Sequence, residues 1–189
     1  RELLASLARL GIVTVIDQPD LVNQKPQLPA YERILRSCSR DIDLLAFIDA
    51  DEFLLPLSPD LNVVDFFASQ FTDESVSAIA LNWAIFGSSG ELFAEDGLVT
   101  ERFTRHAPIK FNVHHNFKSV VKPERVNHFH NPHCADLRYG RYIDALGNDM
   151  VLHPKHGHGV SAEVVWNGVR VNHYAVKSLE EFLLGKHLR

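Results

Sequence analysis

The amino-acid sequence predicts an α/β fold built around a mainly parallel sheet. Segments with apolar residues at helical spacing alternate with short, strongly apolar runs along the first half of the chain. The run Leu44–Ile48 is continuous and of strand length, which is typical of a central strand covered on both faces. An alternation of this kind favours parallel pairing, because each helix serves as a crossover between neighbouring strands.

The first half of the chain supplies this alternation. Gly11 is a stop signal for the first helix, the Pro- and Gln-rich stretch 17–29 predicts a loop, and Asn62 is the expected N-cap of a later helix. The predicted elements are, in order, helix 2–10, strand 12–16, helix 30–39, strand 44–48, helix 62–71 and strand 76–82.

The second half has a different pattern, in which short extended runs, prolines and histidines replace helical periodicity. The chain then ends in an amphipathic segment, where Ser178 and Glu181 have the spacing of a capping box. The predicted elements are strands over 117–121 and 169–174, loops over 126–137 and 153–159, and a last helix over 178–189.

Composition limits the partners and the compartment. The net charge is −5 and the sequence has no long basic run, which argues against nucleic acid because phosphate backbones attract clustered Lys and Arg. No apolar run reaches the roughly 18 residues of a membrane-spanning helix, so we expect no membrane span in this segment. Cys38 and Cys134 form no CxxC pair, which favours a reducing, cytoplasmic compartment.

An acidic tip follows the predicted central strand. Asp49 and Asp51 project to the same side of an extended chain, about 7 Å apart at Cα, and Glu52 projects to the other side. Carboxylates at such a strand end suit Mn²⁺ or Mg²⁺, which also binds substrate phosphates. The alternative interpretation is a polar turn that ends the strand. The apolar neighbours favour the metal site, because carboxylates among them are costly to desolvate.

Four segments of this sequence together resemble one family of enzymes. They are DLLAFIDADEFLLP around the acidic tip; a helix start with Gln27, Ala30 and Tyr31; NWAIFGSSG at 82–90; and the late pieces NHY at 172–174, KS at 177–178 and EEF at 180–182. In this order they resemble GT-A fold glycosyltransferases, closest to the family-2-like bacterial group and the related family 92 group.

The resemblance implies a GT-A sheet and a truncated domain. We expect one glycosyltransferase domain over 1–189 that is cut at both ends, with the first strand before residue 1. Within this domain we expect two halves. Residues 1–98 would bind the donor and the metal, and residues 99–189 would bind the acceptor and include the C-terminal helix.

The resemblance also implies roles for residues on the donor side. Asp51 is the expected direct metal ligand, Asp49 the contact for the donor or for the metal, and His173 a further metal ligand. Lys177 is the expected cation beside the diphosphate, with a solvated helix-start lysine as its alternative. Glu52 is expected to make a structural hydrogen bond within the fold.

On the acceptor side, the resemblance implies a loop and several side chains. Trp83 would stack on a sugar ring, and Lys118 and His133 belong to a segment near the acceptor cleft. The expected loop consists of Gly87, Ser88 and Ser89. An inverting transfer also needs a carboxylate base, for which Glu91 and Asp136 are the leading candidates beside Asp96 and Glu101.

The expected function is transfer of a sugar from a nucleotide-diphosphate sugar to a carbohydrate or other hydroxyl acceptor. The resemblance implies bacterial polysaccharide or glycoconjugate synthesis in the cytoplasm, with membrane association through segments outside this sequence. Two alternatives remain open. The first is a metal-dependent hydrolase, for which three or more histidines would converge on Asp51. The second is a non-catalytic carbohydrate-binding domain on the same fold.

Overall fold

The computed structural model describes residues 2–18, 25–38 and 42–187. Its principal helices are α1 (Glu2–Arg9), α2 (Gln27–Cys38), α3 (Val63–Gln70), α4 (Val99–Arg102) and α5 (Leu179–Phe182), which continues into a π-helical turn over Leu183–His187. Short 3₁₀ turns cover Asn112–His115 and Pro123–Arg125. The strands are β1 (Leu45–Ala46), β2 (Glu52–Pro56), β3 (Val76–Ile85), β4 (Phe117–Val121), β5 (Val126–Phe129), β6 (Ala135–Leu137), β7 (Arg141–Ile143), β8 (Leu152–His153), β9 (Gly157–Ser161) and β10 (Val169–His173).

The main sheet is mixed, so the prediction of a mainly parallel sheet is wrong while the α/β class is confirmed. The sheet has six strands: five run in the order β1-β4-β3-β10-β2, and the sixth, β7, lies off this path and pairs with β3. β3 pairs in parallel with β10 and β7, whereas the β1–β4, β3–β4 and β2–β10 pairs are antiparallel. The physical reason lies after β3, where the connecting segments have only short helical turns and no long crossover helix of the kind that parallel pairs use.

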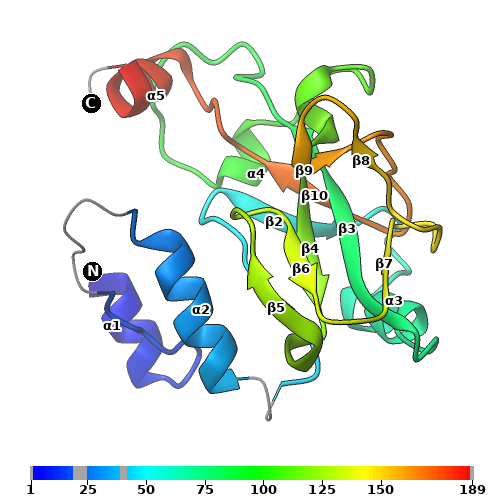
Figure 1. The fold of residues 1–189 in the computed structure, drawn as a ribbon. Helices are drawn as coiled ribbons and strands as arrows, with labels where there is room; N and C mark the ends of the chain where they lie inside the picture. The colour runs from blue at the N-terminus through cyan, green and yellow to red at the C-terminus, as the bar shows by residue number, and fades with distance from the viewer. Residues whose placement is uncertain (1, 19–24, 39–41, 188–189) are drawn as a thin grey trace.

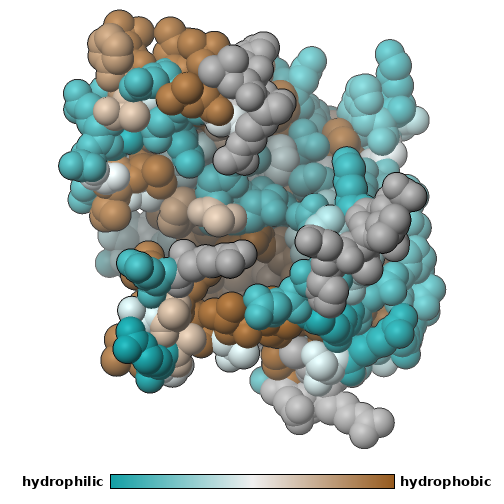
Figure 2. Space-filling model, turned by 90° about the vertical axis from the view of Figure 1, so that its left-hand side faces the viewer, coloured by the Kyte–Doolittle hydropathy of each residue, from teal (hydrophilic) through white to brown (hydrophobic). Residues whose placement is uncertain are grey.

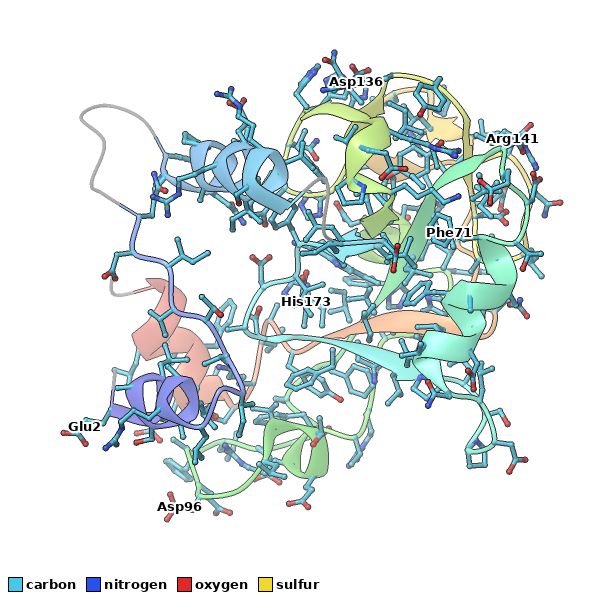
Figure 3. All side chains as sticks on the ribbon, turned by 90° about the horizontal axis from the view of Figure 1, so that it is seen from below. Glu2, Phe71, Asp96, Asp136, Arg141 and His173 are labelled. Atoms are coloured by element: carbon cyan, nitrogen blue, oxygen red, sulfur yellow. The ribbon has the colours of Figure 1, made fainter. Side chains whose placement is uncertain are left out.

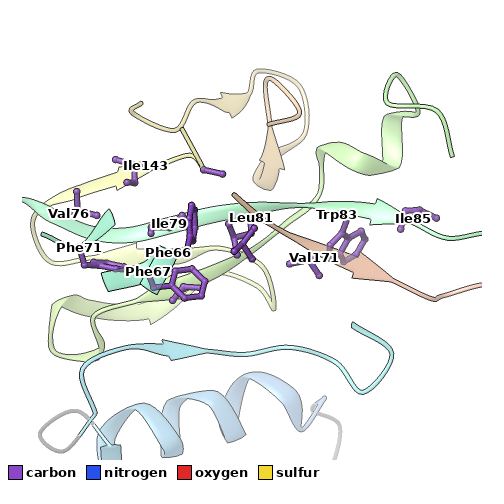
Figure 4. Close-up of a cluster of buried hydrophobic side chains, with 13 residues drawn as sticks. Phe66, Phe67, Phe71, Val76, Ile79, Leu81, Trp83, Ile85, Ile143 and Val171 are labelled. Atoms are coloured by element: carbon purple, nitrogen blue, oxygen red, sulfur yellow. The ribbon is translucent and has the colours of Figure 1, made fainter. Parts of the chain in front are cut away.

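The core is built along β3, whose ten residues are all buried. Phe66 and Phe67 of α3 pack against one face of this strand, beside Val171 of β10 (Figure 4). α3 starts as predicted, because the Asn62 side chain accepts a hydrogen bond from the Val64 amide at 2.7 Å. This core holds β3 and β10 side by side and so fixes where both strands end.

α2 forms a second packing layer on the flank of the sheet that also carries α1 and α5 (Figure 1). Tyr31 of α2 stacks on Phe47 just after β1, with ring centroids 3.8 Å apart, and both rings meet Phe129 edge-on. These aromatic contacts seat the first turn of α2 beside the loop that joins β1 to β2.

Several predicted elements differ in the structure. The run 12–16 belongs to no strand, and Ile12, Val15 and Ile16 are at least half exposed. The predicted loops 126–137 and 153–159 instead contribute to two small antiparallel hairpins, β5–β6 and β8–β9. Their strands are too short to show a clear period in the sequence. They form because each has a partner strand beside it in the fold.

The C-terminal helix begins as predicted. Ser178 and Glu181 form the full capping box, with each side chain bonded to the backbone of the other residue. None of the helices within the described ranges is both long and apolar enough to cross a bilayer.

Candidate functional site

The acidic loop and His173 meet because β2 and β10 are neighbours. Asp49 and Asp51 lie in the turn between β1 and β2, and Glu52 at the start of β2 faces His173 at the end of β10. The Tyr174 amide donates to the Asp51 carbonyl at 2.9 Å, which ties the loop to the end of β10. His173 Nε2 then lies 3.6 Å from Asp51 Oδ1. The predicted pairing of Asp51 with the late histidine is therefore present in the fold.

A buried lysine lies beneath the acidic loop. Lys118 Nζ is 2.9 Å from Asp49 Oδ2 and 3.2 Å from Glu52 Oε2. The side chains of Lys118 and Glu52 are 1% and 0% exposed, whereas 41% of the Asp49 side chain is exposed. The Asp49 amide also donates to Glu52 Oε2 at 2.8 Å, so Glu52 has the structural hydrogen bond that we expected. These contacts anchor the acidic tip to the buried ion pair of Lys118 and Glu52.

Burial and mutual contact shift the pKa values of Glu52 and Lys118. Burial raises the pKa of Glu52, against the opposing effects of the Asp49 amide and the Lys118 ammonium. Burial by itself lowers the pKa of Lys118, but Asp49 and Glu52 outweigh it and raise that pKa above its ordinary value. The ammonium is therefore held in its charged form.

α2 contributes a donor from its first residue. Gln27 Nε2 donates to Asp49 Oδ1 at 3.2 Å and to the Tyr31 hydroxyl at 3.1 Å. With Lys118 on the other oxygen, both carboxylate oxygens of Asp49 have a protein donor. The Gln27 contact was missed in the sequence, although the helix start with Gln27 and Tyr31 is one of the four segments that carry the resemblance.

Trp83 lies between two imidazoles at the end of β3. Its ring centroid is 4.3 Å from that of His173 and 5.0 Å from that of His133, both in edge-on geometry. The Phe117 carbonyl is 3.1 Å from Nδ1 of His133, and burial and the nearby Lys118 ammonium lower the pKa of that imidazole. Trp83 is buried and belongs to the core, so its predicted stacking on a sugar remains a prediction.

The residues at the loop tip fit a hard divalent cation only in part. Among the described residues, no group of three or more His, Cys, Asp and Glu side chains is arranged to hold a metal ion. Asp51 and His173 nevertheless suit two ligands of one ion, because bonds of about 2.1 Å put neighbouring ligands about 3–4 Å apart. Asp49 is committed to Lys118 and Gln27, so the pair Asp51–His173 is the donor set that fits.

The two candidate bases lie on different parts of the fold. Asp136 is on β6, where His128 Nδ1 and His130 Nε2 lie 3.4 and 3.6 Å from its carboxylate. Figure 3 shows Asp136 well away from His173. Glu91 follows the loop after β3, and its carbonyl accepts from the Leu179 amide of α5 at 3.2 Å. Both assignments stay predictions.

The predicted acceptor loop leaves β3 directly beside His173. The Phe86 amide donates to the His173 carbonyl at 2.9 Å, and the next three residues, Gly87, Ser88 and Ser89, turn away from the sheet. The Ser89 hydroxyl accepts from the amides of Thr104 and Arg105, at 2.9 and 3.1 Å, which fixes the loop.

Lys177 adopts a backbone conformation that is rare for a side-chain-bearing residue. Its φ of +58° lies in the left-handed region, immediately before the N-cap of α5. Such strain at a segment that continues from β10 suits a residue placed for binding, but its role beside a diphosphate stays a prediction.

The flank of the molecule that carries α1, α2 and α5 is hollowed (Figure 1, Figure 2). Figure 3 shows His173 on the side of the sheet that faces α1, α2 and α5. The space-filling view shows this flank hollowed near its middle, with apolar residues around the recess (Figure 2). Of the pair, 33% of the Asp51 side chain and 13% of the His173 side chain are exposed.

Comparison with known proteins bears on most of the chain but does not reach His173 or Lys177. The model of glycosyltransferase family 92 matches residues 1–158, a stretch that contains Asp49, Asp51, Trp83, Lys118 and His133. No curated protein matches the chain significantly. The match covers most of the chain and includes three of the four segments that carry the resemblance, while the late pieces at 172–182 lie outside it. The chain belongs to glycosyltransferase family 92 and is a glycosyltransferase.

Proposed function

We propose that this glycosyltransferase transfers a sugar from a nucleotide-diphosphate donor to a hydroxyl acceptor with the help of Mn²⁺ or Mg²⁺. The observation that carries the proposal is the pair Asp51–His173, with 3.6 Å between Oδ1 and Nε2, at a loop tip where 33% of the Asp51 side chain is exposed. One carboxylate and one imidazole leave most of the coordination sphere of such an ion for water and phosphate oxygens.

On the donor side, each residue has a distinct task. Asp51 and His173 would hold the cation, which when bound would neutralise charge on the leaving diphosphate. Asp49, kept in place by Lys118 and Gln27, would accept a hydrogen bond from a donor hydroxyl through its remaining lone pairs. Lys177 would add a positive charge beside the diphosphate.

On the acceptor side, the loop Gly87–Ser89, Trp83 and His133 would border the hydroxyl that attacks. A carboxylate must take the proton of that hydroxyl in an inverting transfer. Glu91 is the better candidate of the two predicted bases, because its segment continues from the strand end beside His173, whereas Asp136 lies on the separate β5–β6 hairpin.

The hydrolase alternative has weaker support. A two-metal hydrolase needs ligands that bridge ions about 4 Å apart. Within the described ranges, the only histidine that forms an ion-pair contact with Asp51 is His173, which is the number expected for a transferase. Cytoplasmic polysaccharide or glycoconjugate synthesis remains part of the proposal and rests on the resemblance alone.

The test uses binding rather than turnover, because the donor is unidentified. Thermal shifts and calorimetry with UDP, GDP, ADP and CDP are measured with and without Mn²⁺. We expect one nucleotide to bind only with Mn²⁺, and Asp51→Ala and His173→Ala to abolish or weaken that binding. Asp60→Ala, at an exposed turn before α3, is the matched control and should bind normally. Equal binding by Asp51→Ala and the parent would contradict the proposed site.

A further inference from the structure

Lys118 is an unusual neighbour for a metal site, because its charge is buried directly against the acidic loop. Its ammonium contacts two carboxylates, Asp49 at 2.9 Å and Glu52 at 3.2 Å, and its side chain is 1% exposed. A surface lysine can swing away when a cation arrives, but a buried one on the central strand β4 has no such freedom.

The ammonium occupies the place that a metal ion would take at these carboxylates. A divalent ion bound to Asp49 Oδ2 would lie within a few ångströms of Nζ, and two like charges at that separation repel, the more so because the Lys118 side chain is only 1% exposed and little screened by water. Within the described ranges, the ion pairs of Nζ are with Asp49 and Glu52. Asp51 instead lies beside Nε2 of His173, whose Nδ1 is 3.9 Å from the second oxygen of Glu52. Any cation at the tip is therefore directed to Asp51 and His173.

We propose that Lys118 is a positioning residue that excludes the metal ion from Asp49 and Glu52 and confines it to Asp51 and His173. The inference deepens the proposed function and rests on it for the identity of the ion. With only two protein ligands, the metal binds weakly alone and firmly when a diphosphate supplies further oxygens. Lys118 thereby couples metal binding to donor binding.

The experiment compares Mn²⁺ affinity of the parent chain and Lys118→Met, by calorimetry without nucleotide. Removal of the ammonium frees Asp49 to join Asp51 and His173, so we expect Mn²⁺ to bind at least about tenfold more tightly, because affinity rises with the charge of the ligand set. The variant should also melt lower in EDTA and regain much of the loss in Mn²⁺. Lys122→Met is the matched control, since Lys122 at the end of the same strand pairs with the exposed Glu74.

Two further variants keep the test decisive. Asp49→Asn in the Lys118→Met background should remove the gain in Mn²⁺ affinity. If Lys118→Met does not fold, Lys118→Met with Glu52→Gln removes both buried charges, retains Asp49 and should show the same gain. Unchanged or weaker Mn²⁺ binding in whichever of these two folds overturns the inference. If the parent binds a nucleotide without any need for Mn²⁺, the proposed function is overturned. The Mn²⁺ affinity of Lys118→Met still decides the inference about Lys118, because it is measured without nucleotide.

Discussion

The buried ion pair of Lys118 and Glu52 provides the sharpest prediction about stability. Lys118→Met leaves the Glu52 carboxylate, which is 0% exposed, without its cation. Breaking a buried pair in this way costs about 3–5 kcal/mol, because one charge remains in a place with little water. Such a loss is a large part of the total stability of a domain, which is about 5–15 kcal/mol.

A double variant separates the cost of the unpaired charge from the cost of the lost packing. In Lys118→Met with Glu52→Gln, no net charge remains at the buried position, and the glutamine oxygen can still accept from the Asp49 amide. We expect this double variant to regain about 2 kcal/mol relative to Lys118→Met, because an unpaired buried charge costs more than a lost neutral contact.

The assay is urea unfolding at pH 7.5 in EDTA, followed by tryptophan fluorescence and circular dichroism. Lys122→Met serves as the control, because it also removes the charge of a lysine side chain that is only 13% exposed, but its partner Glu74 is 85% exposed and stays hydrated without it. A pair with such an exposed partner contributes about 0–1 kcal/mol. A loss in Lys118→Met no larger than that of Lys122→Met would refute the reasoning. So would a double variant that is less stable than Lys118→Met.

Two other predictions concern the scaffold. Gly168→Ala should lose about 1–3 kcal/mol or more; its φ is +62° and an added Cβ would lie 2.3 Å from Phe66 Cε2. Gly185→Ala, which meets nothing within 4 Å, is its control in the same urea assay, and equal losses would contradict the account. His114 is buried and its pKa is lowered from 6.5 by that burial, so the unfolded chain binds more protons and stability falls as the pH drops below 6.5. The slope of unfolding free energy between pH 7 and 5 should be smaller in His114→Gln, and an unchanged slope would show that other groups cause it.

Local sequence patterns were sufficient for features that depend on neighbours in the chain. Asn62 and Ser178 are caps because their side chains reach backbone amides two or three residues away. The run 117–121 is a strand as predicted, with every residue buried. The run 12–16 has the same strand-like composition and yet lies outside any strand, because strand formation needs a partner that no local pattern specifies.

The sequence by itself indicated the family, through the resemblance of four segments, and also the α/β class and the acidic tip, through local periodicity and a short motif. Only the tertiary structure decided that β10 lies between β2 and β3, which brings His173 to Asp51. It also decided that Lys118, 69 positions from Asp49 in the chain, lies buried beneath the loop as its counter-ion. Contacts between distant segments depend on strand order and packing, and a single sequence does not display these.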